Sequence, residues 1–522
     1  MFTSTRSTEL LLYSLQKDDL IIMHPINHVI LFVIDDLRAD QFNSLLNKGF
    51  LPNIKEYLTN GITCENSIAS YPAITYPAQS TMLTGCYPDS YQFPGGHWVK
   101  RDEKIICNYN SYSNFDTVNE ELGTNVKTIF ELVKGSTAGL SIGLVRGASH
   151  FYPTRRQIVS LYLWYLILLR RDMRTLNKLV MNKLLDYFNK PKKFFKEGPP
   201  RLSVAWFLSS DSFLHNYGSN SEIYLQNLKD IDQKIGELIH GTGKRKGLKE
   251  LGCLEDTAFI LTSDHGNFTA KKWVDIAPYF DQIGLIPLIP KKQDGNFDAT
   301  MGSLGFFNLR GATWQERPTI AQMQDYGPRH VDLIHNALLN IPGVRYLYYR
   351  EDANTPESGL IHVLKKESDE IYHATIEYQK DKTKYTYDKK DIFDYSKDEL
   401  AAKILNEKFH SIDEWLMHTY HLDFPMVIDQ VARLFRNPNS CDIMISTCGE
   451  TSFNYEHGKT KNNHIHGHDI ALHSAITVPQ LISSPYIASK TIPFSKSTDI
   501  VPLILKLLGE PIPSNLIGKS LV

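Results

Sequence analysis

The sequence lacks any long hydrophobic run. Its longest apolar stretch covers residues 158–169, whereas a helix needs roughly 20 apolar residues to span a bilayer. Arginines flank the stretch on both sides: Arg155, Arg156, Arg170, Arg171 and Arg174. We expect a buried helix there. The alternative is a lid or an interfacial helix that contacts lipid through aromatic and arginine side chains.

A secretion signal and paired cysteines are also missing. Residues 1–23 are polar and interrupted by charge, without the apolar centre of a signal peptide. The cysteines show no C-x-x-C spacing, and we expect them to be free thiols. They are Cys64, Cys86, Cys107, Cys253, Cys441 and Cys448. These features predict a cytoplasmic protein, with export by a signal-independent route as the alternative.

The chain has little net charge. Lys and Arg total 56 against 58 Asp and Glu, for a formal charge of -2. Without a basic field, bulk binding of nucleic acid is not expected, and any charge on a substrate would be met locally. At 522 residues the chain exceeds the usual size of one domain. We therefore expect one large α/β domain with insertions, or two domains.

Three strand-like runs each lead into an aspartate. Asp35 follows residues 28–34, Asp211 follows 202–208 and Asp264 follows 257–261. Continuous β-branched runs of this kind are typical of buried parallel strands. Open α/β sheets bind ligands at the carboxyl ends of such strands, so the three aspartates lie in ligand positions.

Histidines accompany two of these aspartates. His215 lies four residues after Asp211, an interval at which a short loop or helical turn aims both side chains at one ion, as zinc sites require. His265 follows Asp264 directly, and Gly266 permits the sharp bend that adjacent ligands need. A further group of alternating histidines, His464, His466 and His468, lies about two hundred residues later. Any one of these, taken alone, is more simply a surface residue.

Thr75 is a candidate nucleophile at the start of a helix. Pro77 fits a first turn and Gly85 fits a helix end, so Thr75 lies near the helix N-terminus. Free amides and the helix dipole favour an anion there. A threonine hydroxyl becomes a useful nucleophile when a metal lowers its pKa. The simpler interpretation is an ordinary helix cap.

Together these residues could bind two divalent metal ions and supply one hydroxyl nucleophile. Enzymes that catalyse phosphoryl transfer use this combination of groups. The candidates are Asp35, Thr75, Asp211, His215, Asp264, His265 and His466.

The order of the motifs resembles the alkaline phosphatase superfamily, and most closely its type I phosphodiesterase/nucleotide pyrophosphatase branch. The motifs run Asp, Pro-x-x-Thr-x-Pro, Asp-x-x-x-His, Ser-Asp-His-Gly and His-Gly, and the resemblance covers about residues 28–522. It implies an α/β fold with an alkaline-phosphatase-like core: a mostly parallel, doubly wound sheet with helices on both faces and an inserted cap.

The resemblance also implies the metal ligands. Asp211, His215 and His466 would bind one zinc ion. Asp35, Asp264 and His265 would bind the other, with Thr75 bridging toward it. His466 is chosen because the family has His-Gly followed two residues later by Asp, which leaves His468 at a variable position. A phosphothreonine-type intermediate, cleared by water, would follow.

One position departs from the family, and one related family is excluded. Where that branch has an asparagine three residues after the nucleophile to hold a phosphoryl oxygen, this chain has Ala78, and Gln79 is an alternative donor. Sulfatases share the scaffold but place a formylglycine precursor, Cys or Ser, where Thr75 stands, followed by Pro and Arg. The chain does not match that pattern.

The remaining sequence predicts a core interrupted by an insertion. We expect helices at 128–134, 223–239 and 498–508, and strands at 140–145, 442–447 and 476–482. The predicted segments are an N-terminal extension (1–27), the first part of the catalytic core (28–285), an inserted cap (286–440) and the completion of the core (441–522).

The leading hypothesis is a metal-dependent phosphodiesterase or nucleotide pyrophosphatase with two divalent ions, zinc in the first instance. Its substrate would be a small nucleotide-like or phospholipid-like phosphate ester. A phosphomonoesterase is the alternative, and would need an added cation such as Arg38 or Arg146 to hold the dianion. A phosphoethanolamine-type transferase and a non-catalytic metal-binding protein are further alternatives.

Overall fold

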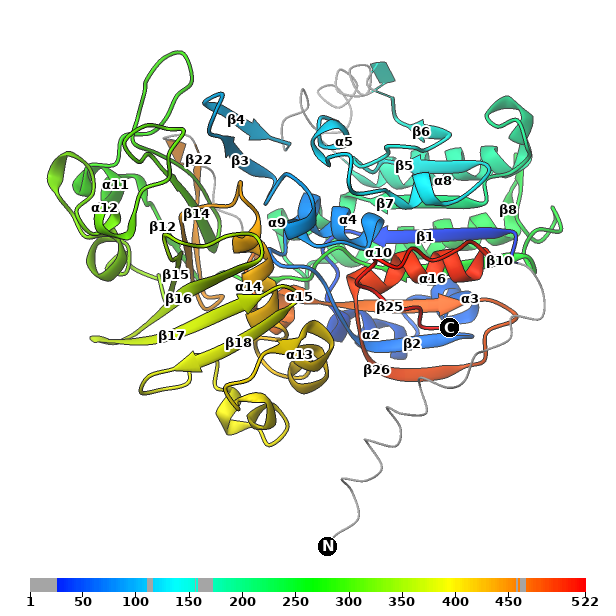
Figure 1. Ribbon diagram of the computed structural model, residues 1–522. Coiled ribbons are helices and arrows are strands. Elements are labelled where there is room, and N and C mark those ends of the chain that lie inside the picture. The colour runs from blue at the N-terminus through cyan, green and yellow to red at the C-terminus, as the bar shows by residue number, and fades with distance from the viewer. Residues whose placement is uncertain (1–25, 110–115, 155, 158–171, 457–458, 461–465) are drawn as a thin grey trace, which may run out of the picture.

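The computed structural model describes residues 26–109, 116–154, 156–157, 172–456, 459–460 and 466–522. Two large sheets lie side by side, with the core sheet at the right of Figure 1 and the second sheet at the left. The apolar run 158–169 and His464 lie outside the described residues. Among the residues that are described, no helix is both long and apolar enough to cross a membrane.

The core sheet has the order β26-β2-β25-β10-β1-β7-β5-β6. In that order its strands are Lys490–Lys496, Ile62–Ile68, Thr477–Ser483, Thr257–Thr262, His28–Ile34, Leu202–Phe207, Thr137–Leu140 and His150–Tyr152. β25 runs antiparallel to both neighbours, and the other pairs are parallel. The predicted mostly parallel α/β sheet is confirmed.

The helices begin and end as follows: α2 Ala39–Asn47, α3 Pro52–Leu58, α4 Thr75–Thr84, α5 Val118–Glu121, α6 Ile129–Leu132, α8 Arg174–Asn189, α9 Ser209–Tyr217, α10 Glu222–His240, α11 Ala277–Ile283, α12 Ile320–Gln324, α13 Ile412–Thr419, α14 Val427–Arg436, α15 His473–Ile476 and α16 Ile500–Leu507.

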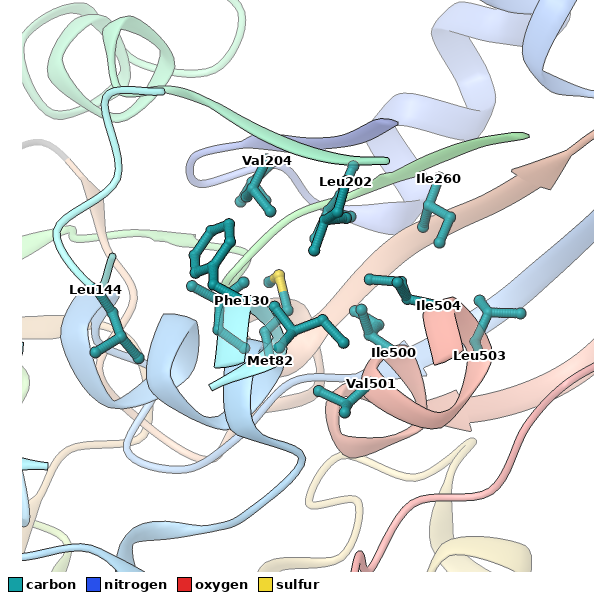
Figure 2. Packing of buried hydrophobic residues seen from close by; sticks show 14 of the residues in the cluster. Met82, Phe130, Leu144, Leu202, Val204, Ile260, Ile500, Val501, Leu503 and Ile504 are labelled. Atoms are coloured by element: carbon teal, nitrogen blue, oxygen red, sulfur yellow. The ribbon is translucent and has the colours of Figure 1, made fainter. Parts of the chain in front are cut away.

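Helices cover both faces of the core sheet because its central strands are apolar on both sides. Along β1, alternate residues join two separate hydrophobic clusters, beginning with Val29 on one face and Ile30 on the other. Helices α4 and α16 pack on the first face, where Met82 of α4 and Ile504 of α16 belong to the same hydrophobic cluster as Val204 of β7 (Figure 2). Helices α2, α3, α8 and α10 cover the second. Side chains that alternate between the two faces of each strand thus pack against the apolar faces of helices on both sides of the sheet.

The second sheet has the order β19-β18-β17-β16-β15-β20-β14-β13-β22-β23 and its strand pairs are antiparallel. In that order its strands are His410–Ser411, Lys382–Tyr387, Glu370–Gln379, Ser358–Glu367, Tyr346–Arg350, Ile443–Ser446, Leu304–Leu309, Phe297–Met301, Tyr455–Glu456 and Lys459–Thr460. Helix α14 packs on one face of this sheet, and α11 and α12 lie on the other.

The described residues also form four short two-stranded ribbons: β3 (His97–Lys100) with β4 (Ile105–Asn108), β8 (Gly241–Thr242) with β9 (Arg245–Lys246), β11 (Phe268–Thr269) with β24 (His466–Gly467), and β12 (Lys272–Val274) with β21 (Thr451–Phe453). The β11–β24 ribbon brings His466 and Gly467 beside Phe268 and Thr269, in the segment that follows His265.

Most of the expected elements are present, and two differ. The strand predicted at 140–145 is wrong: β5 ends at Leu140, because Ser141 takes a left-handed φ of 64° and leaves the sheet. Ile142 and Leu144 pack into the core cluster without strand pairing. The strand expected at 442–447 forms as β20, but it lies in the second sheet rather than in the core sheet. The segment boundaries at 285 and 440 stay predictions.

Candidate metal centre

The carboxyl ends of β1 and β10 bring three predicted ligands together. Asp35 follows β1, Asp264 and His265 follow β10, and the two strands are parallel neighbours. All three side chains are fully buried, with ligand atoms within 4.8 Å of one another. His265 Nε2 lies 3.5 Å from Asp35 Oδ1 and 4.0 Å from Asp264 Oδ1. These are the three residues predicted to share one ion.

A second group forms where α9 follows β7. Asp211 lies in the first turn of α9 and His215 in its last, one helical repeat apart, so both face the same side. His215 Nε2 lies 2.9 Å from Asp211 Oδ1. The third member is His468, whose Nε2 lies 3.9 Å from the same oxygen.

His466, the residue predicted for that third place, has other bonds. Its Nε2 accepts the backbone N–H of Ser219 at 2.8 Å, and its Nδ1 donates to the carbonyl of Phe268 at 3.2 Å. Both ring nitrogens are therefore used by the backbone. His468 differs, since its Nδ1 donates to the carbonyl of Ala73 at 2.6 Å and leaves the Nε2 lone pair facing Asp211. A histidine fixed in this way is typical of metal ligands.

His466 still supports the group through its backbone. Its carbonyl accepts a hydrogen bond from His215 Nδ1 at 2.8 Å, which directs His215 Nε2 toward Asp211. The sequence signal for His468 was its place two residues after His466, but choosing between them required the pairing of β24 with β11.

Thr75 lies between the two groups. It is the first residue of α4, whose end is set by Gly85 with a left-handed φ of 70°, as the sequence predicted. Its Oγ1 is 3.4 Å from His265 Nε2. Thr75, Asp211, His215 and His468 line one cavity of about 350 Å³. The Thr75 hydroxyl thus faces the cavity that Asp211, His215 and His468 also line, and it contacts His265 of the other candidate ligand group.

The carboxylates and histidines shift one another's pKa values strongly. Burial and the neighbouring Asp264 and Asp211 raise the pKa of Asp35 well above its usual range. Burial alone would lower the pKa of His265, but Asp264 and the other nearby carboxylates outweigh it and raise that pKa to about 9. Burial would likewise lower the pKa of His215, but the neighbouring Asp211 carboxylate outweighs it and raises that pKa to about 9. Burial and the charged His265 lower the pKa of His468, which stays neutral.

These residues fit divalent cations. Neither carboxylate oxygen of Asp35 accepts a hydrogen bond from any described residue, although both are buried. An orphaned buried carboxylate is costly unless a cation or a proton neutralises it. Two carboxylates with one imidazole, and one carboxylate with two imidazoles, are both donor sets that suit zinc. Bound ions would replace the protons that the isolated cluster takes up.

Three residues that the sequence left open are placed by hydrogen bonds. Gln79 is buried, and its amide donates to Asp264 Oδ2 at 3.1 Å, so it orients a ligand instead of reaching the cavity. Arg38 pairs with Asp40, and Arg146 bonds Glu131 and the carbonyls of Gly123 and Val126. Neither arginine lines the cavity.

Sequence reasoning missed two further features of the cavity wall. His97 Nε2 lies 2.7 Å from Asp298 Oδ2 in a buried pair that joins β3 to β13. Asp469 accepts the backbone N–H groups of Ser303 and Leu304 at 3.2 and 2.9 Å, and this fastens the β13–β14 turn to the segment that carries His468. Both contacts join residues that are distant in sequence, which no local pattern predicts.

The mostly parallel core sheet, with helices on both of its faces and the candidate ligands at its strand ends, is the fold of the alkaline phosphatase superfamily. The chain belongs to the type I phosphodiesterase/nucleotide pyrophosphatase family, whose sequence model matches residues 29–469.

Similar proteins agree with this placement. A Schizosaccharomyces pombe pyrophosphatase/phosphodiesterase is 26% identical over 240 residues, which cover 46% of this chain and 44% of that protein. Bovine (Bos taurus) ectonucleotide pyrophosphatase/phosphodiesterase family member 3 is 26% identical over 264 residues, covering 49% and 27%. The matched regions thus span less than half the length of these curated relatives.

Solved structures match nearly the whole fold. Human ectonucleotide pyrophosphatase/phosphodiesterase 5 has a TM-score of 0.57 at 13% identity, covering 94% of this chain and 96% of that one. An inactive threonine-to-alanine form of the murine protein, in complex with AMP, has a TM-score of 0.55 at 12% identity, covering 94% and 97%. Similarity at this level of identity concerns the fold.

Proposed function

We propose that the protein is a metal-dependent phosphoric diester hydrolase in which Thr75 is the nucleophile and two divalent ions, zinc in the first instance, are the cofactors. Asp35, Asp264 and His265 would hold one ion. Asp211, His215 and His468 would hold the other, with His468 in the place that the family pattern gives to His466. When bound, such ions lower the pKa of a coordinated hydroxyl and stabilise charge on phosphoryl oxygens.

The chain's own residues supply positioning. Thr75 Oγ1 would give its proton to water and attack phosphorus, forming an Oγ1–P bond while the bond to the leaving alcohol oxygen breaks, and that oxygen would take a proton from water. Water would then cleave the Oγ1–P bond and restore the hydroxyl. The N-terminus of α4, where Thr75 lies, favours the charge on the phosphoryl group. Gln79 keeps Asp264 in place through both steps.

The observation that favours a diester is the charge of the cavity wall. Among the described residues, neither lysine nor arginine lines the cavity. A diester brings one negative charge to the ligand groups, whereas a monoester dianion brings a second charge that no side chain of the wall offsets. Arg38 and Arg146, the candidates for that task, are engaged elsewhere.

A nucleotide-like substrate is supported by size and by the relatives. The cavity volume of about 350 Å³ lies within the usual range for small-molecule sites. Its wall combines apolar residues, such as Phe306 and Leu304, with polar ones, such as Asn454. The names of the relatives and the AMP complex of the murine protein point to the same class.

The test compares zinc-loaded protein with its Thr75→Ala and Thr75→Ser variants. The substrates are bis-p-nitrophenyl phosphate, the p-nitrophenyl ester of thymidine monophosphate and p-nitrophenyl phosphate. We expect turnover of the diesters that disappears in Thr75→Ala and persists at a reduced rate in Thr75→Ser, which keeps a hydroxyl. Preferential turnover of the monoester would contradict the diester proposal, and full activity of Thr75→Ala would contradict the nucleophile.

A further inference from the structure

Two histidines face each other on the second sheet, away from the cavity. His362 on β16 and His373 on β17 are diagonal neighbours on the same face of adjacent antiparallel strands. His362 Nδ1 lies 2.9 Å from His373 Nε2. Neither residue lines the cavity described above.

A carboxylate contacts the outer nitrogen of each ring. His362 Nε2 lies 2.8 Å from Glu351 Oε1, and His373 Nδ1 lies 3.0 Å from Asp388 Oδ2. Because a carboxylate accepts, each outer nitrogen carries the proton. When both rings are neutral, His362 Nδ1 and His373 Nε2 each present a lone pair, and the two lone pairs face each other across 2.9 Å. Something positive, a proton or a metal ion, must lie there for the arrangement to be favourable.

We propose that His362 and His373 form a binding site for a divalent transition-metal ion. The carboxylates correspond to the outer partners that metal-bound histidines usually have, fixing the tautomer and raising the basicity of the ligand nitrogen. Tyr349 holds the His362 ring from its other neighbouring strand, with ring centroids 4.7 Å apart and planes 14° from parallel. The pair is accessible to ions, since the His373 side chain is 32% exposed.

The spacing of the two nitrogens selects the geometry. Ligand nitrogens in adjacent positions of a tetragonal site, at bonds of about 2.0 Å, lie about 2.8 Å apart, and tetrahedral zinc would separate them by about 3.3 Å. The observed 2.9 Å is close to the separation expected for the tetragonal arrangement. Cu²⁺ and Ni²⁺ prefer that geometry with imidazole ligands, and water would complete the coordination. This site does not depend on the chemistry proposed for Thr75.

The test is a copper titration of the zinc-loaded protein, followed by calorimetry and by electron paramagnetic resonance, with zinc content measured in parallel. We expect the wild-type protein to bind one more Cu²⁺ than His373→Ala, with a spectrum that shows coupling to two ligand nitrogens. Asp388→Ala keeps both imidazoles, and its affinity for Cu²⁺ should fall about tenfold or more. The matched control is His335→Ala, which removes an exposed histidine paired with Asp332 and should bind copper as the wild type does.

Two outcomes overturn the proposal. Equal copper binding by wild type and His373→Ala would mean that the pair holds a proton and no metal. Coupling to one nitrogen would mean that the two rings do not bind the same ion. Circular dichroism of each variant verifies folding, and His373→Gln, which retains a polar side chain, replaces His373→Ala if the latter does not fold.

Discussion

The choice between His468 and His466 as the third ligand of one zinc ion can be decided by replacing each with alanine. His468 has one ring nitrogen fixed by Ala73 and the other directed at Asp211. Both ring nitrogens of His466 bond the backbone. Loss of an outer partner of a ligand costs about 10–100-fold in metal affinity, so loss of a direct ligand should cost at least about 100-fold, or about 2.8 kcal/mol.

We therefore expect His468→Ala to retain one tightly bound zinc ion and His466→Ala to retain two. The His466→Ala variant keeps the carbonyl that orients His215, so its zinc affinity should fall by no more than about tenfold. The assay is competition against a chromophoric zinc chelator on metal-stripped protein, with stoichiometry verified by elemental analysis. Loss of a zinc ion from His466→Ala alone would refute the reasoning from the ring nitrogens and restore the ligand that the family pattern selects.

Three further predictions concern the centre and the core beneath it. The pKa values of His215 and His265 are raised to about 9 in the metal-free protein, so each zinc ion must displace a proton at neutral pH. The apparent zinc affinity of each site, measured by calorimetry, should therefore rise about tenfold per pH unit from pH 7 and level off above pH 9. An affinity that does not change with pH would contradict this. Gln79→Leu removes the amide that holds Asp264, so zinc affinity should fall about 10–100-fold in the same chelator assay, whereas unchanged affinity would mean that Asp264 needs no such partner. Ile504→Ala empties a fully buried position under the core sheet and should lower the free energy of unfolding in urea by about 2–5 kcal/mol, with a change below 1 kcal/mol arguing against tight packing there.

Much of the centre was predictable because its signals are local. The strand ends before Asp35 and Asp264 follow from apolar runs that stop at charge, and the structure has β1 and β10 there. The start and end of α4 follow from Pro77 and Gly85. In each case a few consecutive residues determine the backbone, and the sheet then brings the ends together.

The rest depends on partners far away in the chain. Gln79 bonds Asp264, which lies 185 residues away, so its role was not visible in the helix that contains it. The apolar run at 443–446 predicts a strand equally well in either sheet, and only its pairing with β14 and β15 places it in the second. The difference between His466 and His468 likewise rests on a bond to Phe268, 198 residues earlier.

The two ligand groups differ in what holds them together. Asp35, Asp264 and His265 all come from the ends of neighbouring core strands, so this group is as rigid as the sheet itself. His468 belongs to a segment that Asp469 fastens to the turn between β13 and β14. A movement of the second sheet would therefore shift His468 relative to Asp211, and it would also disturb the stacking of His468 on His265, whose ring centroids lie 3.9 Å apart. Of the two ion sites that we propose, the one that includes His468 thus depends more directly on the second sheet, and we expect changes in that sheet to alter the occupancy of that ion first.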